Sequence, residues 1–83
     1  MHHVYVIECS DGTLYTGYTT DVERRIEEHN SGEGAKYTRG RTPVELVHTE
    51  EYETRSEAMS REAEIKKMSR NEKEELVNLY TSG

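Results

Sequence analysis

The turn Ser10–Gly12 constrains the first part of the chain more than any other short segment. It separates an apolar run, Val4–Cys9, from a segment rich in Thr and Tyr, Thr13–Thr19. β-Branched and aromatic residues on both sides of a Gly-containing turn predict a β-hairpin. The first run has apolar residues on both faces of the strand, which is typical of a strand covered on both sides.

The length of this turn decides which face of the hairpin carries each tyrosine. A two-residue loop would place Tyr5 and Tyr15 on opposite faces. A three-residue loop with Gly12 in the bulge position pairs Ile7 with Tyr15 and Tyr5 with Gly17, so that both tyrosines share one face. Gly17 then leaves room beside the Tyr5 ring. We expect the three-residue loop.

A short helix is predicted directly after the hairpin. Thr20–Glu23 has the pattern of a capping box, and Asn30–Gly32 is a typical helix end. Val22, Ile26 and His29 share one helical face, which we expect to meet the sheet.

Two adjacent arginines of this helix differ in position. Arg25 lies at the edge of the apolar stripe and can reach the hairpin, whereas Arg24 points to water. Arg25 could simply bridge helix and sheet, or its planar guanidinium could stabilise charge on a phosphoryl group.

The remainder of the chain predicts one strand and two helices. Val44–His48 alternates as a third strand that could continue to Tyr52. Capping boxes at Thr54–Glu57 and Ser69–Glu72 predict helices from about Ser56 to Met68 and from Arg70 to Tyr80. The element order is therefore ββαβαα, an α+β arrangement in a single domain spanning residues 1–83.

Glu62 interrupts the pattern of its own helix. Ala58, Met59, Ile65 and Met68 form an apolar arc, and Glu62 falls near its middle. A carboxylate there needs a cation. Arg25 is one candidate, and a hard divalent metal such as Mg²⁺ or Mn²⁺ is another.

Other side chains also have both a structural and a chemical interpretation. Tyr5 and Tyr15 fit core packing, and as phenols they could also position or deprotonate a water. His29 could be a satisfied core histidine or a proton carrier. A Gly-rich loop carries a basic patch that could contact phosphates and stack a base, or remain solvated. Its members are Lys36, Tyr37, Arg39 and Arg41.

Composition limits the functional classes. The 83-residue chain has a formal net charge of -6, which argues against a protein that coats nucleic acid through a general basic surface. The single cysteine, Cys9, cannot form an intramolecular disulfide and lies in an apolar run, so we expect a reduced, buried thiol and a cytoplasmic location. No segment is long and apolar enough to suggest a membrane span.

Several motifs together resemble the GIY-YIG nuclease superfamily. They are VYV at Val4–Val6, YTG at Tyr15–Gly17, RRIEEH at Arg24–His29, KYTRGRTPVELV, and REAEIKKMSR at Arg61–Arg70. The chain is most similar to small stand-alone members related to the N-terminal nuclease domain of excinuclease C, a relation that points to DNA repair. The resemblance covers about His3 to Tyr80.

This resemblance implies a small three-stranded antiparallel sheet flanked by helices, and hydrolysis of DNA phosphodiester bonds. It implies one divalent metal, Mg or Mn, held by Glu62, with Arg25 neutralising the phosphate. Tyr5 or Tyr15 would orient or deprotonate the water, and His29 matches a position that holds His or Tyr in many members. The choice of general base among these three residues stays open.

The sequence also departs from the family pattern. VYV replaces GIY, and Tyr18 stands where some members have a lysine. No separate DNA-binding domain is expected, so DNA would be bound weakly, in distorted, single-stranded or branched form, or with a protein partner. We therefore expect a structure-selective, metal-dependent endonuclease or nickase. The alternative is a catalytically weak nucleic-acid-binding or protein-interaction module on the same fold.

Overall fold

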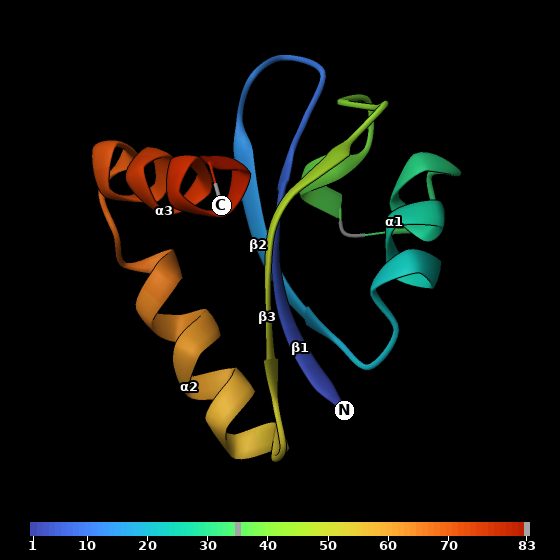
Figure 1. The fold of residues 1–83 in the computed structure, drawn as a ribbon. Helices are drawn as coiled ribbons and strands as arrows, with labels where there is room; N and C mark the ends of the chain where they lie inside the picture. The colour runs from blue at the N-terminus through green and yellow to red at the C-terminus, as the bar shows by residue number, and fades with distance from the viewer. Residues whose placement is uncertain (35, 83) are drawn as a thin grey trace.

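The chain folds into one three-stranded sheet with helices on both faces (Figure 1). The computed structural model describes residues 1–34 and 36–82. The elements are β1 (His2–Glu8), β2 (Leu14–Thr19), α1 (Val22–Asn30), the 3₁₀ turn η1 (Lys36–Thr38), β3 (Glu45–Tyr52), α2 (Arg55–Lys66) and α3 (Arg70–Ser82). The α+β class and the order ββαβαα are thus confirmed. No helix in the described part of the chain combines the length and apolar character needed to cross a membrane.

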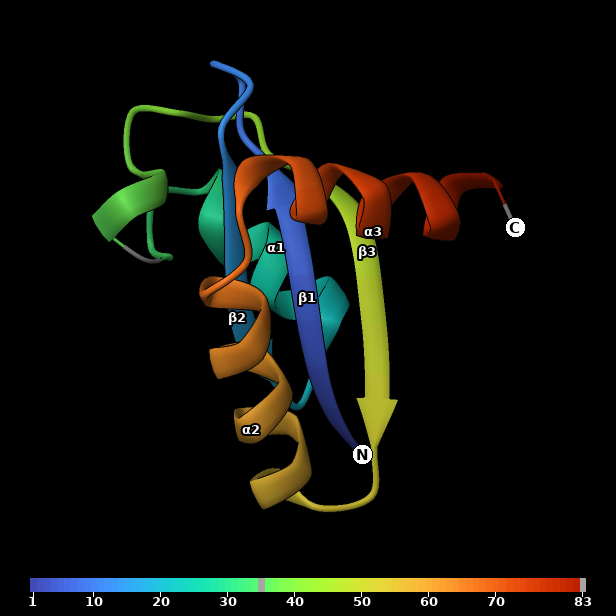
Figure 2. The same cartoon turned by 90° about the vertical axis from the view of Figure 1, so that its left-hand side faces the viewer.

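β1 is the central strand, as its two-sided apolar pattern predicts. The sheet is antiparallel with the order β2-β1-β3. Helix α1 covers one face, whereas α2 and α3 cover the other, with α3 crossing the strands (Figures 1 and 2). Two clusters of buried residues result. The cluster on the α2 face contains Val4, Val6, Ala58 and Ile65, and the cluster on the α1 face contains Tyr5, Ile7, Cys9 and Val44.

The hairpin has the register expected from a three-residue turn. Gly12 has φ of 85°, a left-handed conformation that suits glycine, and its N–H donates to the carbonyl of Cys9. Ile7 pairs with Tyr15, and Tyr5 pairs with Gly17. A side chain at Gly17 would overlap the ring of Tyr5. Gly17 therefore allows the Tyr5 ring to lie across β2.

β3 contains an irregularity that the alternating pattern did not predict. The pairing with β1 shifts between Val6 and Ile7: Leu46 lies opposite Ile7, but His48 lies opposite Val6. This is one residue more on β3 than on β1, the count of a β-bulge. Val44 and Leu46 consequently pack on the α1 face, while His48 does not continue their alternation and lies with Val6 on the α2 face.

Helix caps agree with the sequence at two of three sites. Thr54 caps α2 by accepting from the N–H of Glu57, and Ser69 and Glu72 form a reciprocal capping box at α3. At α1 the expected capping box beginning with Thr20 is wrong. Asp21 is the N-cap and accepts from the N–H of Arg24. An aspartate one residue later supplies the same type of acceptor, so the helix begins at Val22.

The apolar arc expected on α2 is only partly correct. Ala58 and Ile65 are fully buried, and Met68 packs against them, but Met59 is 38% exposed. The buried stripe follows positions three and four residues apart, and Met59 lies outside it. Glu62 lies within the stripe, and its side chain is only 14% exposed.

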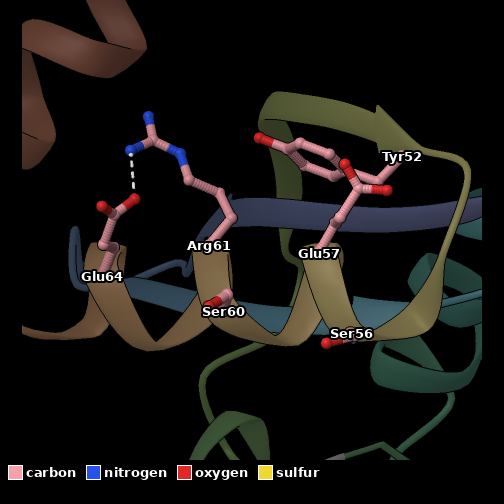
Figure 3. A pocket seen from close by; sticks show the side chains of 6 residues that line it. All are labelled: Tyr52, Ser56, Glu57, Ser60, Arg61 and Glu64. Carbon is pink, nitrogen blue, oxygen red and sulfur yellow. Dashed lines mark hydrogen bonds and ion pairs between the residues drawn. The ribbon is translucent and has the colours of Figure 1, made fainter.

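Glu50 joins β3 to α2 through a dense polar network. Its carboxylate accepts hydrogen bonds from Arg61 Nε at 2.8 Å and from the Tyr52 hydroxyl at 2.6 Å, and lies 2.7 Å from Nε2 of His48. Arg61 also donates to Glu64, as Figure 3 shows. Burial alone would raise the pKa of Glu50, but the hydrogen bonds, that of Arg61 first, lower it to about 2.

The contact between Gly17 and Tyr5 generates a prediction about stability. Gly17→Ala should lower the free energy of unfolding by about 1–3 kcal/mol, because the added methyl group overlaps the tyrosine ring. Urea unfolding measures this loss. Combined with Tyr5→Leu, which removes the overlapping ring atoms, Gly17→Ala should cost much less than it does alone. Strictly additive losses would contradict this explanation.

The Glu50 network predicts a specific pH dependence. The carboxyl has an ordinary pKa of 4.5 and a folded pKa of about 2, so its stabilisation is complete above pH 4.5 and lost as the pH falls through 2. This group alone corresponds to ~3 kcal/mol of unfolding free energy. Urea unfolding between pH 6 and pH 2 should show a weaker pH dependence for Glu50→Gln than for the exposed control Glu53→Gln. Identical pH profiles for the two variants would rule out this role for Glu50.

Candidate active site

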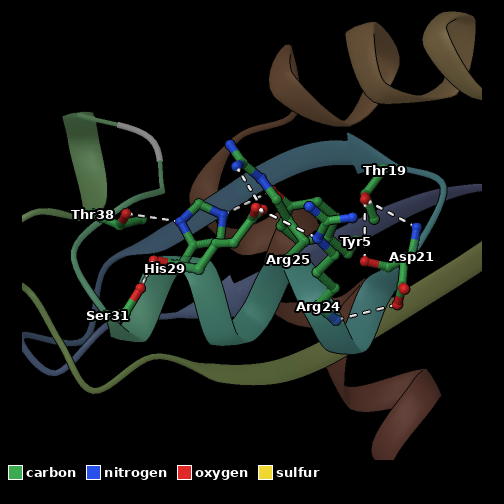
Figure 4. Close-up of polar contacts among 9 residues, drawn as sticks. Tyr5, Thr19, Asp21, Arg24, Arg25, His29, Ser31 and Thr38 are labelled. Carbon is green, nitrogen blue, oxygen red and sulfur yellow. Dashed lines mark hydrogen bonds and ion pairs between the residues drawn. The ribbon is translucent and has the colours of Figure 1, made fainter.

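Tyr5 lies at the centre of the candidate site. It is 1% exposed, and its ring crosses Gly17 of the edge strand β2, so its hydroxyl lies toward that edge of the sheet. Two residues of α1 meet this hydroxyl (Figure 4). Nε2 of His29 lies 2.9 Å from it, and Nε of Arg25 lies 3.4 Å from it. The phenol therefore links β1 to the helix that covers this face.

The same helix face brings Tyr15 into the group. The rings of Tyr15 and His29 meet edge to face, with centroids 5.6 Å apart, and those of Tyr5 and His29 meet similarly at 5.8 Å. Arg25 also donates from Nη1 to Glu28 at 3.2 Å. Four of the residues singled out in the sequence, Tyr5, Tyr15, Arg25 and His29, are thus brought together. Arg24, whose side chain is 75% exposed, points to solvent as expected.

Burial determines the protonation of this group. Burial raises the pKa of Tyr5 above its ordinary value, although the hydrogen bond from Arg25 acts in the opposite direction. Burial also lowers the pKa of His29, and the nearby charge of Arg25 lowers it further. At neutral pH the site therefore contains a neutral phenol, a neutral imidazole and a guanidinium cation.

Glu62 lies on α2, the helix that covers the other face of the sheet. Helix α2 packs against both β1 and β2, and Tyr5 reaches toward the β2 edge. The Glu62 carboxylate is one of the charges that raise the pKa of Tyr5. Its ion-pair partner is Lys66 at 3.6 Å, on the same helix, whereas Arg25 pairs with Glu28.

The side chains around Glu62 suit a metal ion that takes few ligands from the protein. Among the described residues, no cluster of three or more His, Cys, Asp or Glu side chains could hold an ion. Glu62 offers one mostly buried carboxylate, and its ion-pair partner Lys66 is exposed. A single protein carboxylate suits a hard cation that keeps several water ligands and binds substrate phosphate. This fit matches Mg²⁺ or Mn²⁺ better than a metal that needs a complete protein cage.

The basic loop after α1 contains two exposed cations. Lys36 and Arg39 are exposed, and neither forms an ion pair with another residue in the described part of the chain. Arg41 donates to Asp11 at 2.7 Å and so connects the loop to the hairpin turn. Tyr37 lies in η1, but its side chain is outside the described residues.

The sequence did not predict the contacts of two residues in this region. Asn30 accepts from the N–H of Val44 at 2.6 Å and donates to its carbonyl, which closes the base of the loop. Thr38 is 1% exposed, and its hydroxyl lies 2.8 Å from Nδ1 of His29. No local pattern indicates either contact. The polar character of Asn30 at the end of α1 and of Thr38 in the loop was the only signal.

Tyr18, at which the sequence departs from the family pattern, has a partner outside the group around Tyr5. Its hydroxyl lies 2.6 Å from Nδ1 of His2, and its ring stacks on that histidine and lies under the Arg55 guanidinium. It packs against the cluster on the α2 face. Tyr18 is therefore separated by the sheet from the group around Tyr5.

A surface hollow of about 430 Å³ lies elsewhere, between α2 and the end of β3 (Figure 3). Its lining is Tyr52, Ser56, Glu57, Ser60, Arg61 and Glu64. It contains none of the candidate site residues proposed from the sequence. The candidate site is instead the group of side chains on the α1 face.

The charge of Arg25 gives a test of this electrostatic arrangement. Arg25→Gln should raise the pKa of both Tyr5 and His29, because a cation beside them favours the phenolate and disfavours the imidazolium. NMR titration of the Tyr5 Cζ and His29 Cε1 resonances measures both values. Arg24→Gln is the matched control, one residue away and exposed, and should change neither. Equal shifts in the two variants would contradict the assigned geometry.

Comparisons with known proteins show which family the chain belongs to. A family model for the GIY-YIG catalytic domain matches residues 1–75. The chain is 72% identical over 76 residues to a UPF0213 protein of Halobacterium salinarum, and the match covers 92% of this chain and 99% of that protein.

Two solution NMR structures have the same fold. A UPF0213 protein from Bacillus halodurans is 59% identical, with a TM-score of 0.62, and the match covers 94% of this chain and 83% of that one. A protein from E. faecalis is 51% identical, with a TM-score of 0.64, and the match covers 99% and 88%. The resemblance drawn from the sequence motifs is thus confirmed, and the chain belongs to the GIY-YIG catalytic domain family.

Proposed function

We propose that this protein is a metal-dependent endonuclease or nickase that hydrolyses DNA phosphodiester bonds and selects its substrate by structure. The observation that carries the proposal is the convergence of Tyr5, Tyr15, Arg25 and His29 on one face of the sheet, in a chain of this family. We further propose that residues 1–83 act as a single domain. The buried free thiol of Cys9 supports a cytoplasmic location.

Arg25 is the group that would bind the scissile phosphate. Its side chain is 29% exposed, and its Nε and Nη1 are directed to Tyr5 and Glu28. Within the described part of the chain Nη2 donates no hydrogen bond, so one side of the planar fork is left for a phosphate oxygen. A guanidinium held in this way stabilises charge that develops on phosphate oxygens without reorganising during the reaction.

Proton transfer from the attacking water would involve one of three ring side chains. Hydrolysis requires the attacking water to lose a proton, and a phenol or imidazole within hydrogen-bond reach can orient that water or accept the proton. Tyr5, Tyr15 and His29 are the candidates, and the Tyr5–His29 hydrogen bond provides a route for a proton between two of them.

Glu62 would hold the metal. When bound, the ion would stabilise negative charge on the leaving oxygen. The charge of Glu62 is the smallest of the causes that shift the pKa of Tyr5, and this electrostatic link supports assigning the metal to that carboxylate.

Charge limits the form of DNA that this site can bind. Lys36, Arg39 and Arg41 supply the basic patch, with Arg41 partly committed to Asp11, and the whole chain has a net charge of -6. So few cations give little sequence-independent affinity for regular duplex. We infer that single-stranded, nicked or branched DNA, whose backbone and bases are more accessible, is the better substrate.

Cleavage of labelled DNA tests this function directly. With Mg²⁺ or Mn²⁺, the native protein should cut at least one of single-stranded, duplex, nicked and branched substrates, and EDTA should stop the reaction. Glu62→Gln and Arg25→Gln should each lower the rate by about 10²-fold or more, because each removes charge stabilisation. Arg24→Gln should remain active. Absence of any product, or products that persist in both active-site variants, would favour a binding module instead.

A further inference from the structure

A chain of buried hydrogen bonds connects the candidate site to the basic loop. Thr38 Oγ1 lies 2.8 Å from Nδ1 of His29, and Nε2 of the same ring lies 2.9 Å from the Tyr5 hydroxyl. Thr38, His29 and Tyr5 are 1%, 0% and 1% exposed. Figure 4 shows Thr38 approaching the histidine from the side opposite to Tyr5. Bulk water is therefore not an alternative partner for these groups.

The direction of these hydrogen bonds follows from what each group can donate. Tyr5 is a neutral phenol that accepts from Arg25 Nε–H, so its own O–H needs an acceptor. Nε2 of His29 is the acceptor within reach. A neutral imidazole has one acceptor and one donor, so Nδ1 carries the proton and donates it to the Thr38 hydroxyl. Thr38 thus stabilises the one tautomer in which His29 accepts from Tyr5.

The loop is shaped so that it holds Thr38 in this position. Gly34 lies against His29 so closely that a Cβ there would overlap the ring. The base of the loop is closed by Asn30 and Val44, and its far end is attached through Arg41 to Asp11. These contacts hold the loop on both sides of Thr38.

The same segment carries the exposed cations. Lys36 begins η1 and Thr38 ends it, and the N–H of Arg39 donates to the carbonyl of Lys36. Because the turn is this short, a phosphate bound by Lys36 and Arg39 would act on the backbone that positions the Thr38 hydroxyl.

We propose that Thr38 is a positioning residue: its hydroxyl fixes the tautomer and orientation of His29 and thereby couples phosphate binding at Lys36 and Arg39 to the Tyr5 phenol. This inference rests on the proposed nuclease function and deepens it. Thr38 does not touch the substrate. It acts through His29, as partners of the second ring nitrogen do in other histidine sites.

Two variants of Thr38 distinguish the effect of its hydroxyl from the effect of its side-chain shape. Thr38→Val keeps the volume and removes the hydroxyl, whereas Thr38→Ser keeps the hydroxyl and removes a methyl group. Long-range ¹H–¹⁵N NMR of His29 reports which nitrogen carries the proton. Native protein and Thr38→Ser should show the proton on Nδ1, and Thr38→Val should move population to the Nε2–H form. Thr38→Ala serves in place of Thr38→Val if the latter does not fold.

Kinetics on the preferred DNA provide the second readout. Thr38→Val should lower kcat by about 10- to 100-fold with little change in KM, and Thr38→Ser should restore most of the rate. Lys36→Ala and Arg39→Ala should raise KM and, because their phosphate contact acts through Thr38, should also lower kcat. An unchanged His29 tautomer in both hydroxyl-free variants, or equal kcat in Thr38→Val and Thr38→Ser, would overturn the role of Thr38.

The NMR readout needs no substrate, so the two proposals can fail separately. If the native protein cuts no DNA, the proposed function falls, and the His29 resonances still decide whether Thr38 sets the tautomer. If the native protein cuts DNA while the tautomer is independent of the Thr38 hydroxyl, the nuclease stands and the positioning role is wrong.

Discussion

The contact between Tyr5 and Gly17 is the constraint on which the rest of the site depends. A three-residue turn sets the register, the register puts the glycine opposite the tyrosine, and the missing side chain lets the ring lie across the edge strand. The hydroxyl then reaches His29 and Arg25 on α1. A register shifted by one residue would turn the ring to the other face and leave both helix residues without this partner.

The two faces of the sheet have separate tasks. On the α2 face, Val4 and Val6 pack against Ala58 and Ile65, and Glu50 adds a network of charged hydrogen bonds. Much of the apolar burial that supports β1 therefore lies away from the polar group around Tyr5. Buried polar groups contribute little net stability even when they are hydrogen-bonded. A small domain can therefore hold such groups on the α1 face because the apolar packing on the α2 face supplies stability.

The buried polar side chains on the α1 face form hydrogen bonds with one another. Tyr5, His29 and Thr38 come from β1, α1 and η1, and each supplies the partner that another requires. In a low-dielectric interior an unpaired member would be costly, so the three segments are ordered together. This interdependence explains why a Gly-rich loop with exposed cations also contains a buried threonine.

Local features were determined by the sequence alone. The turn chemistry indicated the hairpin register, the capping residues located two of the three helix starts, and the helical period placed His29 toward the sheet and Arg25 at its edge. These inferences succeeded because each depends on residues within a few positions of one another. The family motifs then selected the same tyrosines, arginine and histidine as a group.

Only the tertiary structure decided the contacts between distant segments. The bulge that moves His48 to the other face, the pairing of Asn30 with Val44, and the hydrogen bond from His29 to Thr38 leave no periodic trace in the sequence. Each depends on where two segments meet in space, which local propensity does not specify. The sequence therefore determined which elements form and which faces they bury, and the packing of the loop against α1 decided how the buried polar groups are connected.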